Sequence, residues 1–165
     1  MIRMSDDYLR GFVEGEGMFY IGVVPSKETK NGWQVIYFFK VSQNPSGKIV
    51  LEFLKNRLGC GYIKENSKTD KTDKSLAFVV RDFKDLQEKV IPFFKGKLLI
   101  KKQNFKKFRE VLKYVSERKH LTKEGLEEIL NLSYSMNTHK RKLTKEFCKV
   151  TSQLSLLFNI SIVVS

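Results

Sequence analysis

The sequence predicts an α+β fold in which helices cover one face of a twisted, antiparallel or mixed four-stranded sheet and leave the other face free. Three observations predict it. Segments with helical spacing of apolar residues alternate with pairs of strand-like segments. Polar loops join the strands of each pair, which favours hairpins. Of the 165 residues, 41% are hydrophobic and thirteen are Phe, so the chain can bury a core.

The predicted elements follow the order helix, two strands, helix, two strands and further helices. In chain order they are a helix over 5–15, strands over 19–24 and 33–43, a helix over 49–58, a strand from residue 62, a strand over 76–81, a short helix over 83–90, a helix over 101–116 and a last helix after residue 122. The polar stretches between them are expected to be turns and loops.

Individual residues set the boundaries in the N-terminal half. Ser5 is a good N-cap, and Asp6 and Asp7 suit the first turn of a helix. The strand formers that follow this helix stop at Pro25, which cannot donate a strand hydrogen bond. Gly59 is expected to end the second helix, because glycine readily adopts the left-handed conformation at that position.

The C-terminal half carries weaker boundary signals. Pro92 is expected to break the short helix that begins near Phe83. The apolar residues over 101–116 recur at helical spacing, and Thr122 is a candidate cap for the last helix. We expect one domain over residues 1–137 and a C-terminal extension over residues 138–165, which begins basic and ends apolar.

The charge distribution indicates a polyanionic partner. The net charge is +13, and nucleic acid is the commonest partner of so basic a protein. Residues 1–45 hold 5 basic and 5 acidic residues, whereas residues 96–165 hold 15 and 6. A free cationic sheet face fits the DNA major groove. The plainer alternative is a lysine-rich surface that is simply solvated.

Other classes of protein find little support. Cys60 and Cys148 form neither a disulfide framework nor a zinc-binding spacing, which favours a reducing compartment. His120 and His139 have no His or Cys neighbour at ligand spacing. The N-terminus lacks the apolar core of a signal peptide, and no stretch is long and apolar enough to be a membrane span.

The most distinctive motif lies over residues 9–17, Leu-Arg-Gly-Phe-Val-Glu-Gly-Glu-Gly. Gly11 and Gly15 are four residues apart, so they leave one helix face nearly bare and allow another backbone to approach. Glu14 and Glu16 lie where the helix should end. A carboxylate there is suited to hold a divalent cation, and that chemistry suits phosphodiester hydrolysis.

This motif, with the aromatic-rich strand after it, resembles that of the LAGLIDADG homing endonucleases, and the resemblance covers roughly residues 5–117. It implies an αββαββα core whose sheet forms a DNA-binding saddle. The family carries the motif once in homodimers and twice in single-chain pseudo-dimers. One motif therefore implies a homodimer that cuts both DNA strands at a long, near-palindromic site.

The resemblance also implies roles at the active centre. Glu16 matches the metal-binding acid, and the carbonyl of Gly15 is expected to be a second ligand. The ion is expected to be Mg²⁺, with Mn²⁺ as an alternative. Gln43 matches the residue that positions the attacking water. Lys101 matches the basic residue that stabilises transition-state charge, and Lys97 or Lys102 takes this role instead if the match to the family is shifted along the chain. Their plainer interpretations are a strand-end polar residue and surface lysines. Glu14 is expected to cap or support the motif helix, with direct metal binding as the lesser alternative.

Two surfaces follow from the same resemblance. DNA contacts are expected from the exposed faces and loops of the strands, at Tyr20, Ser26, Lys27, Lys30, Gln34, Lys40, Lys64, Asn66, Lys68, Ser75 and Arg81. The dimer interface is expected at Tyr8, Gly11, Phe12 and Gly15. Arg10 stands where the family usually has a small residue, so we expect its side chain to point outward.

Partners and location follow from the same hypothesis. Double-stranded DNA is the expected partner, and intron RNA is a further candidate. The expected location is wherever the target DNA lies, either an organelle (chloroplast or mitochondrion) or a prokaryotic cytoplasm.

Two other functions stay open on the sequence alone. One is a catalytically silent DNA- or RNA-binding relative, such as an intron maturase or a transcriptional regulator. The other is a basic structural protein, such as a ribosomal component.

Overall fold

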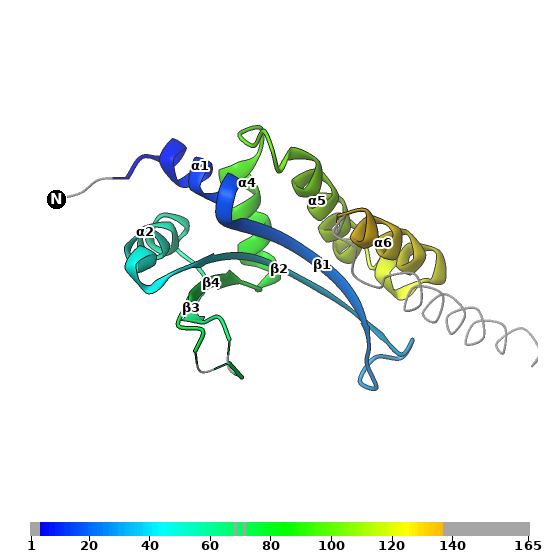
Figure 1. Ribbon diagram of the computed structural model, residues 1–165. Coiled ribbons are helices and arrows are strands. Elements are labelled where there is room, and N and C mark those ends of the chain that lie inside the picture. The colour runs from blue at the N-terminus through cyan, green and yellow to red at the C-terminus, as the bar shows by residue number, and fades with distance from the viewer. Residues whose placement is uncertain (1–3, 68, 71, 137–165) are drawn as a thin grey trace, which may run out of the picture. The chain divides into compact units, whose positions relative to one another are not determined.

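The computed structural model describes residues 4–67, 69–70 and 72–136 of the chain (Figure 1). Its principal elements are α1 (Asp6–Glu16), β1 (Gly17–Pro25), β2 (Trp33–Gln43), α2 (Lys48–Leu58), β3 (Tyr62–Glu65), β4 (Leu76–Val80), α3 (Phe83–Asp85), α4 (Ile91–Phe94), α5 (Lys102–Ser116) and α6 (Lys123–Met136). The four strands form one sheet in the order β1-β2-β4-β3. The α+β prediction is confirmed. No helix in the described part of the chain is long and apolar enough to cross a membrane.

Most predicted boundaries agree with the structure. The Ser5 side chain accepts a hydrogen bond from the Tyr8 N–H, as expected of an N-cap. Strand β1 ends at Pro25, and β2 has the predicted bounds. Gly59 adopts the left-handed conformation after α2, with φ of 63°. The Thr122 hydroxyl accepts from the Gly125 N–H at the start of α6.

The predicted break at Pro92 is wrong. Helical turns continue from α3 through a π-helical stretch, η2 (Leu86–Val90), into α4, and Pro92 lies in the first turn of α4. The Ile91 N–H donates to the Leu86 carbonyl five residues back, which marks the wider π turn. A wider turn makes room for the proline ring, and the first turn of a helix tolerates the missing N–H.

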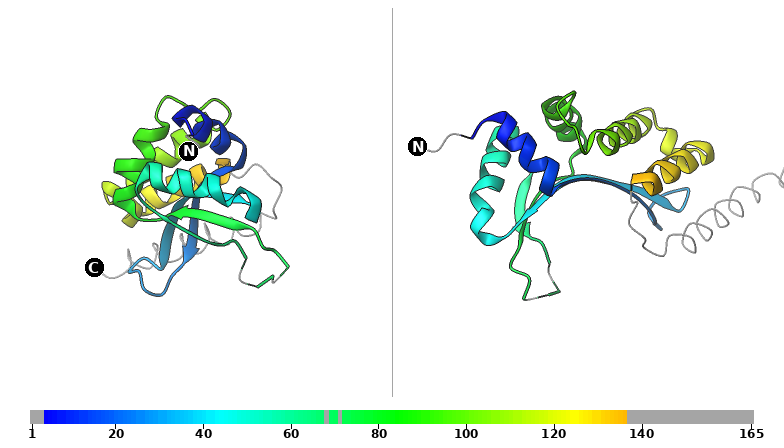
Figure 2. Two further views of the ribbon diagram at one scale, coloured as in Figure 1. Left: turned by 90° about the vertical axis from the view of Figure 1, so that its left-hand side faces the viewer. Right: turned by 45° about the horizontal axis from the view of Figure 1, so that its top comes forward.

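The chain divides into two compact units, the first comprising residues 1–20 and 37–109. In this unit β4 pairs antiparallel with both β2 and β3. Figures 1 and 2 show α1, α2 and α4 on the same side of the strands. The core between them is aromatic: the Phe19 ring lies within 6 Å of the rings of Phe39, Phe94, Phe105 and Phe108, with centroid distances of 5.0 to 5.7 Å. Such ring contacts add to the burial energy of the core.

Strand parity separates a core face from a free face in this unit. Phe39 and Val41 of β2 are fully buried and pair in register with Val80 and Phe78 of β4. Lys40, between them, therefore points to the opposite face. The free face comprises Met18, Tyr20, Phe38, Lys40, Ser42, Tyr62, Lys64, Asn66, Ala77, Val79 and Arg81. The predicted free sheet face is thus present and carries several cations.

The second unit comprises residues 21–36 and those from 110 onward. Its described part has a core in which Trp33 packs with Leu126 and Leu130 of α6, with Val23, Val35 and Tyr134 around them. A side chain at Gly125 is excluded, because a Cβ there would lie 2.1 Å from the Lys119 carbonyl oxygen. The predicted boundary at residue 137 stays a prediction, since residues 137–165 lie outside the described range.

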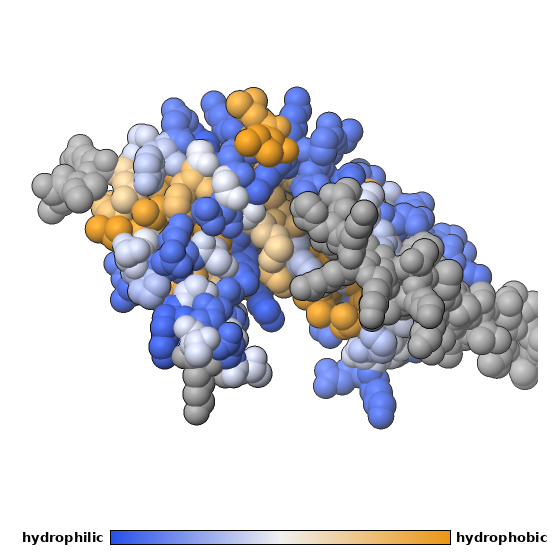
Figure 3. All heavy atoms as spheres, in the orientation of Figure 1, coloured by the Kyte–Doolittle hydropathy of each residue, from blue (hydrophilic) through white to orange (hydrophobic). Residues whose placement is uncertain are grey.

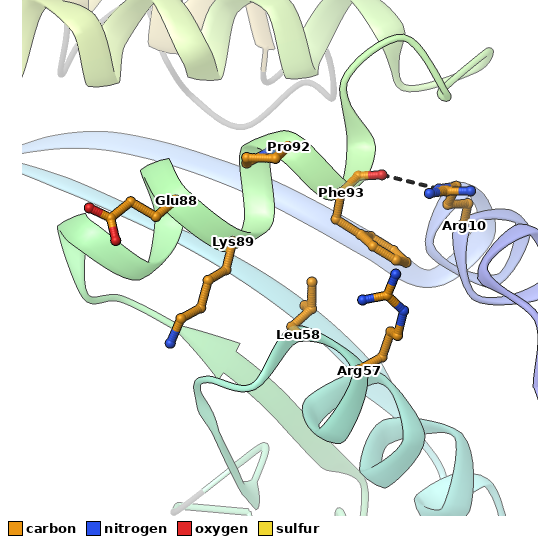
Figure 4. A pocket seen from close by; sticks show the side chains of 7 residues that line it. All are labelled: Arg10, Arg57, Leu58, Glu88, Lys89, Pro92 and Phe93. Atoms are coloured by element: carbon orange, nitrogen blue, oxygen red, sulfur yellow. Dashed lines mark hydrogen bonds between the residues drawn. The ribbon is translucent and has the colours of Figure 1, made fainter.

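A charged cluster ties α1 to α2 and α4 in the first unit. Arg57 makes two hydrogen bonds to the Asp6 carboxylate, at 2.6 and 2.7 Å. Arg10 donates to the Phe93 carbonyl at 3.1 Å, and both guanidinium groups lie over the Phe93 ring (Figure 4). The expectation that Arg10 points outward is wrong. Its side chain is 17% exposed, because the carbonyl, the ring and the aspartates satisfy its charge within the unit.

Candidate active site

Helix α1 ends at Glu16 and strand β1 begins at the next residue, so Glu16 lies at a helix-to-strand junction. Its side chain is exposed. The C-terminal end of the helix carries partial negative charge, and the Glu16 carboxylate adds to it. This concentration of negative charge attracts a cation. The Gly15 carbonyl is among the last four of the helix, which lack partners inside it. Two hard oxygen donors therefore occur at adjacent positions.

Gln43, at the end of β2, lies close to this junction. One depression in the surface is lined by Glu16, Ser42, Gln43, Asn44 and Ser75. The Gln43 side-chain oxygen accepts a hydrogen bond from the Asn44 N–H at 2.7 Å. That bond engages the amide oxygen and leaves the N–H₂ donors of Gln43 as the groups available to a ligand. The structure thus brings together the predicted metal acid and the predicted water-positioning amide.

Gly47 makes the Gln43 conformation possible. A Cβ at Gly47 would lie 2.2 Å from Gln43 Cγ and 2.9 Å from its Cδ, well inside contact distance. Any other residue would therefore force the Gln43 side chain to move. Gly47 therefore supports the depression although it does not itself line it.

Glu14 anchors a different helix from its own. Its carboxylate accepts hydrogen bonds from the backbone N–H groups of Leu99, Ile100 and Lys101, the last two at 2.9 and 3.0 Å. These groups lie in the turn just before α5, so Glu14 holds that turn against the motif helix. The sequence predicted that Glu14 supports its own helix, whereas in the structure its carboxylate binds the backbone that leads into α5.

Lys101 is therefore tied through its backbone to the motif helix. Its side chain is half-buried, whereas Lys97 and Lys102, the two alternatives of register, are exposed. The structure does not bring Lys101 among the residues that line the depression. Its predicted catalytic role stays a prediction.

The metal-binding hypothesis fits the donor types present. The described residues contain no group of three or more His, Cys, Asp and Glu that could hold a metal. Glu16 and the Gly15 carbonyl supply oxygen ligands, which Mg²⁺ prefers over sulfur or nitrogen. Phosphate oxygens or a second carboxylate would complete such a set of oxygen ligands.

The free sheet face holds five of the predicted DNA contacts in the first unit, and a sixth, Ser75, lines the depression with Glu16. Tyr20 stacks on Phe38 with ring centroids 4.6 Å apart. The Arg81 guanidinium also lies over the Phe38 ring, 5.1 Å from its centroid. Lys40 Nζ donates to Asn66 Oδ1 at 2.6 Å. Lys64 shares the face with Lys40. Lys68 lies outside the described residues.

Four predicted contacts belong to the second unit. Lys27, Lys30 and Gln34 are exposed, in the β1–β2 loop and on β2. Ser26 instead shapes the loop, because its hydroxyl accepts from the Glu28 N–H at 3.3 Å and its own N–H donates to the Gly32 carbonyl. This engagement makes Ser26 a weaker candidate for contacting DNA than the lysines beside it.

The glycine face of α1 is open. A Cβ at Gly11 or Gly15 would meet no atom within 4 Å. Tyr8 is 51% exposed on the same helix, while Phe12 is partly buried. An apolar patch lies over the loop between α4 and α5, which carries Leu99 and Ile100, 87% and 81% exposed (Figure 3). Glu14 holds this loop against α1, so the patch and the bare helix face adjoin.

Comparison with known proteins identifies the family. A family model described as LAGLIDADG endonuclease matches residues 9–112, more than half of the chain. The chain belongs to the LAGLIDADG endonuclease family. The match begins with the motif helix and ends within α5, so it includes Glu16, Gln43 and Lys101.

Curated relatives of this LAGLIDADG protein are longer. The probable intron-encoded endonuclease 2 of Neurospora crassa is 30% identical over 147 residues, 87% of this chain and 31% of its own length. An uncharacterized 50.9 kDa protein in ND4 intron 1 of Podospora anserina is 29% identical over 70% of this chain and 25% of its own length. The chain spans a third or less of these relatives.

Solved structures show the same fold. The homing endonuclease I-TnaI is 34% identical with a TM-score of 0.75, and the match covers 96% of this chain and 98% of that one. I-LtrWI, solved bound to target DNA, is 30% identical with a TM-score of 0.76, but the match covers 86% of this chain and 47% of I-LtrWI. The LAGLIDADG fold here therefore corresponds to nearly the whole of one relative and about half of another.

Sequence reasoning missed two residues of the depression. Ser42 and Asn44 flank Gln43 and line the same surface as Glu16. Their position next to a predicted site residue at a strand end was the only available signal. Proximity to Glu16 depends on how α1 and β2 pack, which spacing along the chain does not reveal.

Proposed function

We propose that this LAGLIDADG protein is a site-specific, metal-dependent DNA endonuclease that acts as a homodimer with Mg²⁺ and hydrolyses both strands at a long, near-palindromic site. One observation carries the proposal. Glu16 lies exposed at the end of a helix whose glycine face is open, and it shares a depression with Gln43. A metal-binding acid is thereby available next to a surface that a second copy can approach.

Each residue has a distinct task in the proposed reaction. Glu16 and the Gly15 carbonyl would hold Mg²⁺, which when bound polarises the phosphodiester and lowers the pKa of water. Gln43 would orient the attacking water through its amide. Lys101, held beside α1 by Glu14, would stabilise negative charge that develops on the phosphate.

DNA binding is supported by charge and by relatives. The free sheet face displays Lys40, Lys64 and Arg81 in the first unit. I-SmaMI and I-LtrWI, which share the fold, were solved bound to DNA. Phosphate contacts from such lysines would give affinity that falls with salt, and base contacts would give specificity.

The homodimer is supported by the match lengths and the open helix face. The chain corresponds to slightly less than half of I-SmaMI and I-LtrWI. Two copies of this fold would therefore equal one such relative. Contact through Gly11 and Gly15 would bring the two Glu16 carboxylates together at the two-fold axis. The relatives described as intron-encoded favour an organelle or another compartment that holds intron-bearing genes.

The proposal is tested by cleavage of a randomised palindromic duplex library with Mg²⁺, with E16Q in parallel. We expect cutting at one enriched two-fold symmetric sequence, and we expect E16Q to bind that sequence without cutting it. Equal loss of cutting and binding in E16Q would contradict the metal role of Glu16. Duplex or intron-RNA binding with no cutting in Mg²⁺ or Mn²⁺ would favour a maturase or regulator instead.

A further inference from the structure

Two side chains on the free face of the first unit are locked together across the sheet. Lys40 extends from β2, and Asn66 follows β3, with β4 between these strands. Their 2.6 Å hydrogen bond spans that central strand. Below it, Val79 and Ala77 are 1% and 0% exposed. Among the described residues, polar side chains and their stems shield these two positions on the free face.

Both positions are on rigid backbone. Lys40 lies in the β2–β4 ladder opposite Val79. The Asn66 N–H donates to the Ser75 carbonyl at 2.9 Å, which extends the β3–β4 pairing by one more residue. The pair is therefore preorganised, and a base edge would meet a defined arrangement of donors and acceptors rather than two mobile side chains.

The chemistry of the pair determines which groups it presents. A lysine ammonium has three N–H donors and no acceptor, so it can only face the oxygen of the Asn66 amide. The amide orientation is settled by that requirement. With its oxygen engaged, Asn66 presents its NH₂ group, and Lys40 presents its remaining N–H donors. The pair as a whole offers donors.

The bases differ in the hydrogen-bond donors and acceptors that they present in the major groove. In the major groove guanine presents two acceptors, N7 and O6, whereas adenine presents one acceptor and one donor. An unpartnered Asn reads adenine with its oxygen and its NH₂ together. We propose, resting on the DNA-binding function above, that the Lys40–Asn66 pair is a specificity determinant that reads guanine at one position of each half-site.

The electrostatics of the pair favour an acceptor-rich ligand. Partial burial and the neighbouring Lys64 ammonium lower the pKa of Lys40, and the opposite charge of Asp73 offsets part of this effect. Two lysines on one face repel each other, so an electronegative base edge or a phosphate would relieve the repulsion. A base and a phosphate are distinguished by the sequence dependence of binding, which the experiment measures.

The experiment is selection of bound duplexes from a randomised library, carried out in an E16Q background so that binding is measured independently of cleavage. K40M keeps the stem of Lys40 but removes its charge and frees the Asn66 oxygen. K64M, the matched control, removes one charge from the same face. We expect E16Q alone to select guanine at one position per half-site. K40M should shift this position toward adenine, with at least about a tenfold loss of guanine preference.

The control K64M and a second variant, N66A, distinguish base readout from a general loss of binding. K64M should weaken binding of all sequences similarly and keep the guanine preference. N66A should weaken that preference without a shift to adenine, because no amide remains to read it. Uniform weakening by K40M with unchanged base preference would show a phosphate contact and overturn the inference. An absence of any guanine position would overturn it too. Failure of the wild-type protein to cleave the selected site would instead count against the proposed function alone.

Discussion

At the scale of single residues, the candidate active site depends on a few close approaches. Glu16 and Gln43 come from a helix end and a strand end that are 27 positions apart, and they line one depression. The Gln43 side chain lies against the backbone of Gly47, where a Cβ has no room. A small residue that contacts no ligand thus determines where a proposed catalytic amide lies.

We expect G47A to reduce DNA cleavage by at least about tenfold while target binding changes little, because the added Cβ displaces Gln43, and misplaced groups lose rate steeply. Single-turnover cleavage and equilibrium binding to the selected duplex are the measurements. The Gln43 side chain can move, so the free energy of unfolding should fall by only about 1 to 2 kcal/mol. Cleavage at the wild-type rate by folded G47A would remove Gln43 from the mechanism.

At the scale of elements, α1 is the centre of the first unit's electrostatics. Its N-terminal turn carries Asp6, which binds Arg57 of α2, and its C-terminal half carries Glu14, which binds the turn that leads into α5. Both acids act through defined hydrogen bonds rather than through general charge. Each therefore predicts a local effect that can be separated from loss of fold.

We expect E14A to lower the free energy of unfolding by about 1 kcal/mol, since it removes the hydrogen-bond acceptor of three backbone N–H groups in the turn before α5. The amide hydrogens of Leu99, Ile100 and Lys101 should exchange faster, and cleavage should fall because Lys101 loses its anchor. E14Q, which keeps one acceptor oxygen, should lie between E14A and the wild type. Unchanged exchange at these three amides would show that the Glu14 carboxylate does not hold them by hydrogen bonds.

We expect D6N to destabilise the protein by about 1 kcal/mol at pH 7, a value limited by solvent screening because Asp6 is one-third exposed. The hydrogen bonds from Arg57 lower the pKa of Asp6. The stabilisation is therefore complete above the unfolded-state pKa of about 3.9 and is lost as the pH falls below it, through the folded-state pKa. Urea titrations of wild type and D6N over this pH range measure the difference.

The matched control is D7N, at a neighbouring acid whose side chain is 90% exposed and which has only one ion pair with Arg10. Its effect should not exceed a few tenths of a kcal/mol. A D6N effect that equals the D7N effect, or that is independent of pH between 3 and 7, would show that the Asp6 cluster does not stabilise the fold.

At the scale of the whole molecule, the proposed homodimer depends on a surface that lies open in the described part of one copy. The glycine face of α1 has no neighbour within 4 Å of an added Cβ, and the Leu99–Ile100 loop beside it exposes large apolar side chains. Exposed apolar surface next to a bare helix is typical of an interface. The net charge of +13 would oppose association of two copies, so packing at this face must overcome it.

We expect G11L to convert a dimer into a monomer without loss of fold, because a Cβ at this position meets no described atom within 4 Å, whereas a leucine side chain prevents close contact between two helices. Sedimentation equilibrium measures the association, and circular dichroism checks the fold. N56L, on an exposed position of α2, is the control for added surface hydrophobicity. A wild-type protein that sediments as a monomer, alone and on its target duplex, would contradict the homodimer.

The order of elements, the cap at Ser5, the stop at Pro25 and the left-handed Gly59 are determined by local sequence, because propensity, capping and periodicity act within a few residues. The motif over residues 9–17 likewise identified the family and the metal-binding candidate. The inward position of Arg10 and the contact of Glu14 with the turn before α5 were decided only by tertiary structure. Both depend on partners more than 80 positions along the chain, and the favourable energy of such contacts exists only once packing has brought those partners together. The helix continues through Pro92 because of a wide turn between Leu86 and Ile91, which the helical periodicity of the sequence did not reveal.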